Sequence, residues 1–160
     1  MQGTKLKQYL DRSGVHYEVI YHLTSYTAQD TAEISHISGK EIAKTVIVNI
    51  GETIPEMIMV VLPASYKVDF NLLKKVMGIP FAILASEEEF RDMFPDCDVG
   101  AMPPFGSLYR MDVVVDNTLA EDDDIVFNAG SHQELIKMNF LDYQRLANPH
   151  ILHLTMMATA

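Results

Sequence analysis

The segment with the clearest capacity for chemistry is a loop rich in glycine and proline at residues 100–106. Its sequence, GAMPPFG, places two glycines around two consecutive prolines and one phenylalanine. Proline has a fixed φ and no backbone N–H, so this segment can be neither a helix nor an inner strand. Glycine lets the backbone reach positive φ or approach another group closely. We therefore expect a stiff loop with exposed backbone amides at its ends, an arrangement suited to holding a ligand.

Lys44 is a second candidate, at the start of an apolar strand predicted for residues 43–50. Because side chains two residues apart share a strand face, Lys44 lies on the same face as Val46 and Val48. A lysine on such a face either extends its ammonium past the strand end into water or reaches into a polar cavity. The residues alone favour the first alternative.

A polar turn formed by Gly130, Ser131 and His132 follows a predicted strand that ends at Asn128. It can form one wall of a site, or it can be an ordinary β-turn that uses Asn128 and Gly130 for their backbone tolerance. Considered alone, the turn is better explained as the ordinary one.

The remaining reactive side chains predict neither an activated nucleophile nor a metal site. Cys97 is the only thiol, and the neighbouring carboxylates of Asp96 and Asp98 raise the pKa of such a thiol, so we expect it to be inert. The histidines lack the spacing of zinc ligands, and the nucleotide-binding and serine-hydrolase motifs are missing from the sequence. A catalytic function must then rely on an easy reaction, on positioning and on backbone donors, with no cofactor.

The apolar pattern predicts strands and helices that are interspersed without a regular βαβ repeat. This order favours an α+β fold, a mixed sheet flanked by helices, over a doubly wound parallel fold. Strands are predicted at residues 15–22, 43–50, 56–62, 81–84, 109–116, 124–128, 135–138 and 151–155. Helices are predicted around residues 6–10, at 27–37, and after the N-caps Asp69, Ser86 and Asn139.

Composition limits the class of protein. The 160 residues are 48% hydrophobic, enough for a sizeable core and for a single domain spanning 1–160. Twelve basic and 22 acidic residues give a net charge of −10, so we expect contact with nucleic acid to be limited to an end or a few nucleotides. The sequence lacks an apolar run near the ~20 residues that span a membrane and lacks a leader peptide, so we expect a cytoplasmic protein without membrane contact.

Three segments together resemble the YbaK/EbsC family, which includes the editing domain inserted in bacterial prolyl-tRNA synthetase and its free-standing relatives. They are residues 43–48 (AKTVIV), 100–106 (GAMPPFG) and 127–132 (FNAGSH), in the order and spacing of the family. The resemblance extends over roughly residues 15–146. It implies an α+β fold with a strongly curved, mainly antiparallel sheet of about six to seven strands and helices packed around it.

The resemblance also implies an activity, aminoacyl-tRNA deacylation. Family members hydrolyse the ester that joins a wrong amino acid to the terminal ribose of a tRNA, often alanine or cysteine on tRNA for proline. Lys44 matches the family's essential lysine, which interacts with the tRNA 3′ end. Gly100 and Pro103 fall on the GxxxP loop that confines the aminoacyl carbonyl, and water is the nucleophile, assisted by a ribose hydroxyl. The implied partners are the aminoacyl-tRNA acceptor end and, secondly, prolyl-tRNA synthetase.

These considerations define a predicted site. Lys44 and the backbone amides of Gly100 and Ala101 are the predicted catalytic groups, the amides stabilising the oxyanion. Met102, Phe105 and His132 are expected to limit the size of the acyl group. The predicted substrate-binding residues are Thr45, Met102, Pro103, Pro104, Phe105, Gly106, Gly130, Ser131 and His132.

One alternative function stays open at this point, a non-catalytic module that keeps the pocket for a metabolite or a protein partner. The acidic composition favours it, whereas Lys44 and the complete GxxxP loop favour the enzyme. The sequence leaves the edited amino acid, the tRNA and the oligomeric state undetermined.

Overall fold

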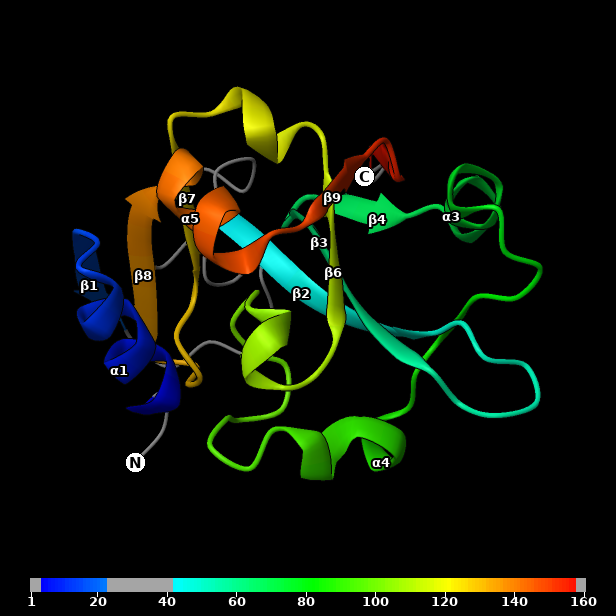
Figure 1. Ribbon diagram of the computed structural model, residues 1–160, viewed down its shortest axis with the longest axis horizontal. Coiled ribbons are helices and arrows are strands. Elements are labelled where there is room, and N and C mark those ends of the chain that lie inside the picture. Colours follow the sequence, from blue (N-terminus) through cyan, green and yellow to red (C-terminus); the bar gives the residue numbers. More distant parts are fainter. Residues whose placement is uncertain (1–3, 23–41, 158–160) are drawn as a thin grey trace.

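The computed structural model describes residues 4–22 and 42–157. Its centre is a mixed, open sheet of eight strands, which twists so strongly that β6 runs across the direction of β2 in Figure 1. The strand order is β1-β8-β7-β2-β3-β6-β9, with β5 paired to β2. The bounds are β1 Tyr17–Tyr21, β2 Ile42–Asn49, β3 Met57–Pro63, β5 Ile83–Leu84, β6 Asp112–Asp116, β7 Asp124–Asn128, β8 Glu134–Asn139 and β9 His150–Leu152.

Antiparallel pairing predominates in this sheet. β1–β8, β7–β8, β2–β3 and β2–β5 are antiparallel, whereas β2–β7, β3–β6 and β6–β9 are parallel. The predicted β2–β3 hairpin forms because the Asn49 side chain holds its turn, accepting hydrogen bonds from Gly51 N–H (2.9 Å) and Glu56 N–H (3.0 Å). The predicted fold class is confirmed, with eight strands rather than six or seven in the main sheet.

A second, two-stranded sheet pairs β4 (Tyr66–Val68) with β10 (Thr155–Met157). Neither strand was predicted as such, because β4 has only three residues and the strand expected at 151–155 is divided into β9 and β10. The break follows from Asp116, which is fully buried and accepts a hydrogen bond from the Leu154 N–H at 3.0 Å.

Local capping explains where the helices begin and end. Their bounds are α1 Thr4–Ser13, α3 Phe70–Met77, α4 Glu87–Phe90 and α5 Phe140–Ala147, with short 3₁₀ turns η1 Arg91–Met93, η2 Gly106–Leu108 and η3 Leu119–Glu121. The predicted N-caps Asp69, Ser86 and Asn139 all accept backbone hydrogen bonds, and Ser86 forms the predicted capping box with Glu89. The helix predicted at 27–37 lies outside the described residues.

Two residues predicted to be buried on helices are exposed. Val76 on α3 is 39% exposed, and Met93 is 42% exposed. α4 makes a single turn and continues as the 3₁₀ turn η1, which changes the residue spacing and rotates Met93 outward. Among the helices that the structure describes, none combines the length and the apolar character that a membrane span requires.

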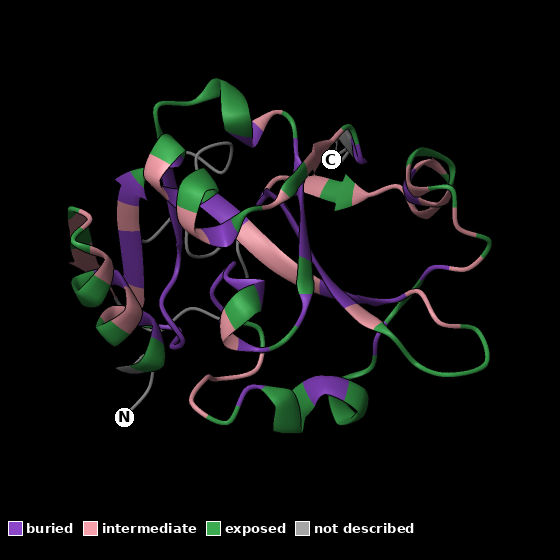
Figure 2. Cartoon of the chain, viewed as in Figure 1, coloured by how far each residue is buried: buried purple, intermediate pink, exposed green. Residues whose placement is uncertain are grey.

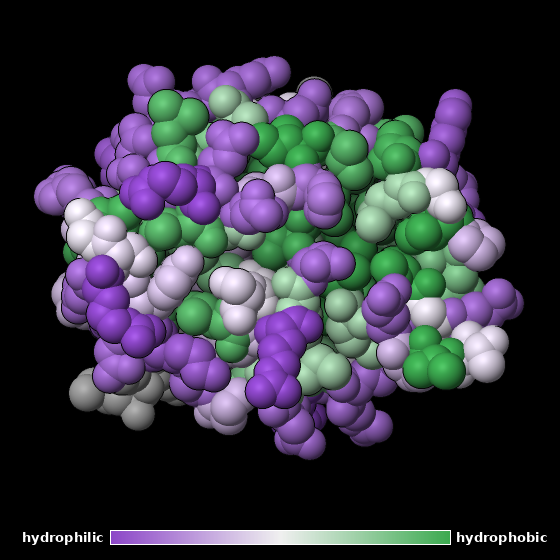
Figure 3. Space-filling model, in the orientation of Figure 1, coloured by the Kyte–Doolittle hydropathy of each residue, from purple (hydrophilic) through white to green (hydrophobic). Residues whose placement is uncertain are grey.

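The sheet separates apolar cores. A first core lies between the sheet and helices α1 and α5, and Figure 2 shows long parts of β6, β7 and β8 buried, with exposed positions on these helices. A second core on the other face packs against α3, and a small third core adjoins it. Figure 3 shows polar side chains interspersed with smaller apolar areas on one face of the molecule. Along β2, Ala43 and Ile47 face the first core, whereas Ile42 belongs to the third and Val48 to the second.

Candidate active site

Lys44 projects from β2 on the face of the second and third cores. Its neighbours two residues away, Ile42 and Val46, belong to the third and second cores, and Leu62 lies opposite Lys44 on β3. The side chain is half-buried, and within the described residues it makes neither a hydrogen bond nor an ion pair. Burial lowers the pKa of the Lys44 ammonium, and the nearby charge of Lys67 lowers it further. Lys44 is therefore a partly desolvated cation, and the described part of the chain supplies no counter-ion for it.

The end of β7 connects Lys44 to the polar turn. β2 and β7 run parallel with Ala43 opposite Phe127, so the chain that continues from Phe127 into Gly130 passes beside Lys44. Ser131 and His132, which complete the turn, are both buried. Lys44, near the start of β2, thus lies beside the end of β7, where the turn begins.

Backbone hydrogen bonds fasten this turn to the glycine–proline loop. Asp98 N–H donates to the Gly130 carbonyl at 2.8 Å, and Gly130 N–H donates to the Ala101 carbonyl at 2.9 Å. The His132 Nε2 lies 2.8 Å from the Val99 carbonyl, and since a carbonyl only accepts, Nε2 carries the proton. Two of the predicted segments, the loop and the turn, therefore form one connected structure.

Gly100 occupies the junction of loop and turn and has the conformation that the sequence predicts. Its φ is +86°, and a Cβ there would stand 3.4 Å from the His132 ring. Gly100 is exposed, and its N–H donates only to the Met102 sulfur at 3.2 Å, a weak acceptor. An incoming oxyanion is a far better acceptor, so this amide is readily redirected to a substrate.

Ala101 differs from the expectation. Its residue is fully buried, and its N–H donates to the Asp98 carbonyl at 3.1 Å. The sequence could not reveal this because the acceptor becomes available only when the loop turns back on itself. Of the two backbone amides, that of Gly100 is therefore the more available to an incoming acceptor.

The rest of the loop is packed into the first core. Phe105 is fully buried, with its ring centroid 5.2 Å from Tyr143, 5.6 Å from Phe127 and 6.0 Å from Tyr9. The Tyr143 hydroxyl donates to the Pro104 carbonyl at 2.8 Å. These contacts make Phe105 a core residue that supports the loop, which corrects the expectation that its ring limits the acyl group.

Two other predicted substrate-binding residues lie on the opposite face of the sheet from Lys44, and two more are buried in the loop. Thr45 is the next residue along β2, so its side chain points to the opposite face of the sheet. Met102 belongs to the first core and is 5% exposed. Pro103 and Gly106 are buried, and a Cβ on Gly106 would overlap the Met111 carbonyl, so that glycine is required by packing.

Cys97 is inert, as its sequence neighbours predict, although burial is the larger cause. Burial raises the pKa of its thiol to about 12, and the charges of Asp96 and Asp98 act in the same direction. The thiol lies 3.2 Å from the Tyr109 hydroxyl, which in turn donates to Asp96 at 3.0 Å. With its pKa raised this far, the thiol stays protonated at neutral pH.

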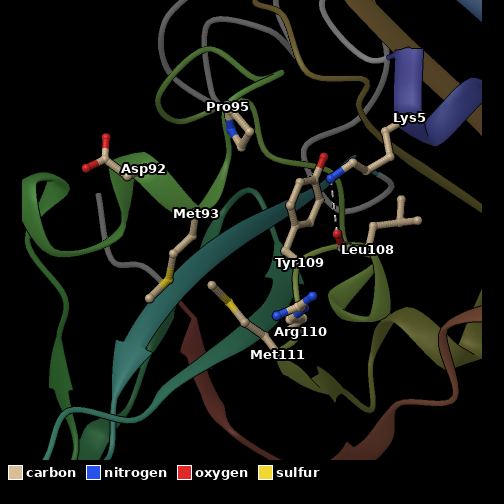
Figure 4. A pocket seen from close by; sticks show the side chains of 8 residues that line it. All are labelled: Lys5, Asp92, Met93, Pro95, Leu108, Tyr109, Arg110 and Met111. Carbon is tan, nitrogen blue, oxygen red and sulfur yellow. Dashed lines mark hydrogen bonds between the residues drawn. The ribbon is translucent and has the colours of Figure 1, made fainter.

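A cavity of about 420 Å³ lies elsewhere (Figure 4). Lys5 of α1 reaches into it and donates to the Leu108 carbonyl at 3.5 Å, beside the Tyr109 ring. Met93 and Met111 also line it, on the side of the first core. None of the predicted site residues lines this cavity, and its lysine already has partners, so we place the candidate site at Lys44.

The partly desolvated ammonium of Lys44 leads to a stability prediction. A lysine whose pKa is lower in the folded chain than in the unfolded chain opposes folding below that lowered pKa. The penalty is relieved as pH rises from the lowered pKa towards ~10.4, the unfolded value, because the unfolded chain then binds more protons. Lys44→Met should therefore raise the free energy of unfolding at pH 7, and this gain should shrink by pH 10.

Urea denaturation at both pH values measures this difference between variant and wild type. Lys75→Met, at an exposed position on α3, is the matched control and should show little gain at either pH. A Lys44→Met protein that is less stable than wild type at pH 7 would contradict the prediction.

Comparison with known proteins decides the class of the site. The family described as the aminoacyl-tRNA editing domain matches residues 22–146, a range that includes Lys44, Gly100 and the polar turn. The chain belongs to this family. The predicted YbaK/EbsC resemblance is thereby confirmed, as is the predicted class of enzyme, a hydrolase acting on aminoacyl-tRNA esters.

Individual relatives of this editing domain agree with the assignment. The Multifunctional Ser/Thr-tRNA deacylase ProXp-y of Escherichia coli K12 is 28% identical over 146 residues, covering 90% of this chain and 87% of the relative. The solved structure of hypothetical protein APE2540 matches with a TM-score of 0.83 at 20% identity, covering 95% of this chain and 99% of that one. A protein described as a trans-editing enzyme for prolyl tRNA synthetase gives a TM-score of 0.81 at 18% identity, covering 96% of both chains. At such identities, the two structures show that the fold is shared.

Proposed function

We propose that this editing domain is a trans-acting deacylase that hydrolyses the ester of tRNAs carrying a small, wrong amino acid. The observation that supports the proposal most directly is the half-buried Lys44 ammonium, which lacks a counter-ion among the described residues and stands beside the turn that holds Gly100. A phosphate of the tRNA 3′ end is an anion suited to such a cation. The predicted alternative, a non-catalytic binding module, is not favoured by membership of an editing family.

The proposed reaction needs little from the protein beyond positioning. An aminoacyl ester is already activated, and each ~1.4 kcal/mol taken from its barrier gives a tenfold rate increase. Lys44 fixes the 3′ end, so that the ester carbonyl meets the Gly100 N–H. One such donor aimed at a developing oxyanion contributes about 2.7–4 kcal/mol. A water molecule attacks the carbonyl carbon, the ester oxygen leaves with the ribose, and the amino acid is released.

The proposed substrates differ in the amino acid that the enzyme removes from the tRNA. The sequence resemblance predicts alanyl or cysteinyl esters on tRNA for proline, whereas the Escherichia coli relative is named for seryl and threonyl esters. All four acyl groups are small, and an apolar pocket separates groups that differ by one methylene by only ~1–3 kcal/mol. We therefore include all four in the proposed substrate class.

The net charge of −10 supports recognition of the acceptor end rather than of a long stretch of tRNA. Lys67, which is exposed near Lys44, adds a second cation at that end. Prolyl-tRNA synthetase as a partner remains a prediction from the resemblance. The single domain spanning 1–160 remains a prediction from length and composition.

Deacylation of a panel of radiolabelled tRNAs tests the proposed function. Seryl-, threonyl-, alanyl- and cysteinyl-tRNA are incubated with the protein, and the acid-precipitable label is followed over time. We expect at least one ester to be hydrolysed about tenfold or more above its spontaneous rate. The correctly charged tRNA, which carries proline on the tRNA for proline, should be hydrolysed more slowly than that ester. Release of none of the four amino acids above the spontaneous rate would reject the proposal.

A further inference from the structure

Asn128, the last residue of β7, lies beside Lys44 on the same face of the sheet. β2 and β7 run parallel with Ala43 opposite Phe127, so Lys44 and Asn128 are the next residues on their strands. Phe127 faces the first core, whereas Leu135, which is paired with Asn128 on β8, belongs to the third. Because side chains alternate along a strand, the Asn128 amide shares the face of Lys44 and Leu135.

The side-chain oxygen of Asn128 is buried and has no hydrogen-bond partner among the described residues. The residue as a whole is 9% exposed. Asn49 on β2 is the internal comparison, since it is 6% exposed and its Oδ1 accepts from both Gly51 N–H and Glu56 N–H. Buried amides are ordinarily satisfied in this way, so an open acceptor beside the candidate site points to a donor that arrives with the substrate.

The charges around Asn128 select the kind of donor. Lys44 carries a cation on the adjoining strand, and Lys67 acts on Lys44 as a further positive charge. A second ammonium would be repelled there, whereas a hydroxyl donates a hydrogen bond without adding charge. The acyl end of an aminoacyl-tRNA offers two such hydroxyls, the side chain of a seryl or threonyl group and the terminal ribose.

We propose that Asn128 is a specificity residue whose amide oxygen accepts a hydrogen bond from a hydroxyl of the substrate's acyl end, with the seryl or threonyl side chain as the expected source. The inference rests on the proposed deacylase function. A seryl ester fills the open acceptor, whereas an alanyl ester leaves it unpaired. A site built to bond a hydroxyl discriminates against a substrate that lacks it, so the enzyme should prefer hydroxyl-bearing acyl groups.

The test compares wild type with Asn128→Leu on seryl- and alanyl-tRNA that share the same tRNA body. The measured quantity is the ratio of kcat/KM for the seryl ester to kcat/KM for the alanyl ester. We expect Asn128→Leu to lower this ratio by about tenfold. The melting temperature should stay level or rise, because no internal hydrogen bond is lost. Asn128→Ala is the second variant, should leucine prove too large for the site.

Asn49→Leu is the matched control, with the same residue type and similar burial but two internal hydrogen bonds. We expect it to lower the melting temperature and to leave the seryl-to-alanyl ratio as in wild type. A further arm uses seryl- and alanyl-tRNA whose terminal ribose lacks its free hydroxyl. An equal loss on both esters in Asn128→Leu, with no further effect of the substitution on the substrates that lack the hydroxyl, would support the hydrogen bond and assign its donor to the ribose.

The other outcomes overturn the inference. The inference is wrong if Asn128→Leu and Asn128→Ala have the same kcat/KM as wild type on every substrate. It is also wrong if these variants melt at a lower temperature while the seryl-to-alanyl ratio stays as in wild type. Failure of wild type to hydrolyse any of the four esters of the panel above would instead reject the deacylase function on which the inference rests, whereas hydrolysis of the threonyl or cysteinyl ester without the seryl ester would overturn the inference alone.

Discussion

Lys44→Ala should lower kcat/KM for aminoacyl-tRNA deacylation by about 10- to 150-fold. This range corresponds to the ~1.5–3 kcal/mol that a hydrogen bond to a charged group contributes. The cation is half-buried and lacks another partner among the described residues, so its whole capacity is available to the tRNA 3′ end. Initial rates at substrate concentrations well below KM measure the effect.

Two variants separate the role of Lys44 from general loss of structure. Lys75→Ala removes a lysine at an exposed position on α3 and should retain nearly full activity. Lys44→Arg keeps the charge but replaces a compact ammonium with a planar group, and should recover only part of the rate. Full activity in a folded Lys44→Ala protein would show that this ammonium does not hold the substrate.

Phe105→Ala should lower the free energy of unfolding by about 3–5 kcal/mol, the usual effect of truncating a buried phenylalanine. Phe105 is fully buried and meets the rings of Tyr9, Phe127 and Tyr143. These rings belong to α1, β7 and α5, so the truncation opens a cavity where three elements meet. Urea denaturation monitored by circular dichroism gives the change.

Leu141→Ala provides the comparison, because Leu141 lies on α5 and is 71% exposed. Its truncation should change stability by less than about 0.5 kcal/mol. A loss below about 1 kcal/mol for Phe105→Ala would mean that this ring does not support the loop as its burial indicates.

The two faces of the sheet carry different parts of the candidate site. The face of the first core anchors the glycine–proline loop through Phe105 and through the bond from Tyr143 to Pro104. The opposite face presents Lys44 beside the end of β7. Gly100 lies where the loop meets the polar turn, and that junction is fixed by hydrogen bonds to Gly130 on either side of it. The packing of the loop on one face therefore sets the position of the Gly100 amide, which the proposed reaction uses together with Lys44 on the other face.

Local interactions account for what the sequence alone could predict. Asp69, Ser86 and Asn139 cap their helices with bonds to residues two or three positions along the chain, and the β2–β3 hairpin is closed by residues near its own turn. The family motifs are likewise short and continuous. Each motif consists of residues that are close together in the sequence, so it can be recognised without the structure.

The packing of distant segments decided the rest. Whether Phe105 lines a pocket or fills a core depends on Tyr9 and Tyr143, which lie far from it in sequence. The register between β2 and β7 placed Asn128 beside Lys44, and no pattern within either strand specifies that register. Whether a buried polar atom forms hydrogen bonds depends on the partners that the fold brings to it. Only the tertiary structure could therefore show that Asn49 Oδ1 accepts hydrogen bonds, whereas Asn128 Oδ1 has no partner among the described residues.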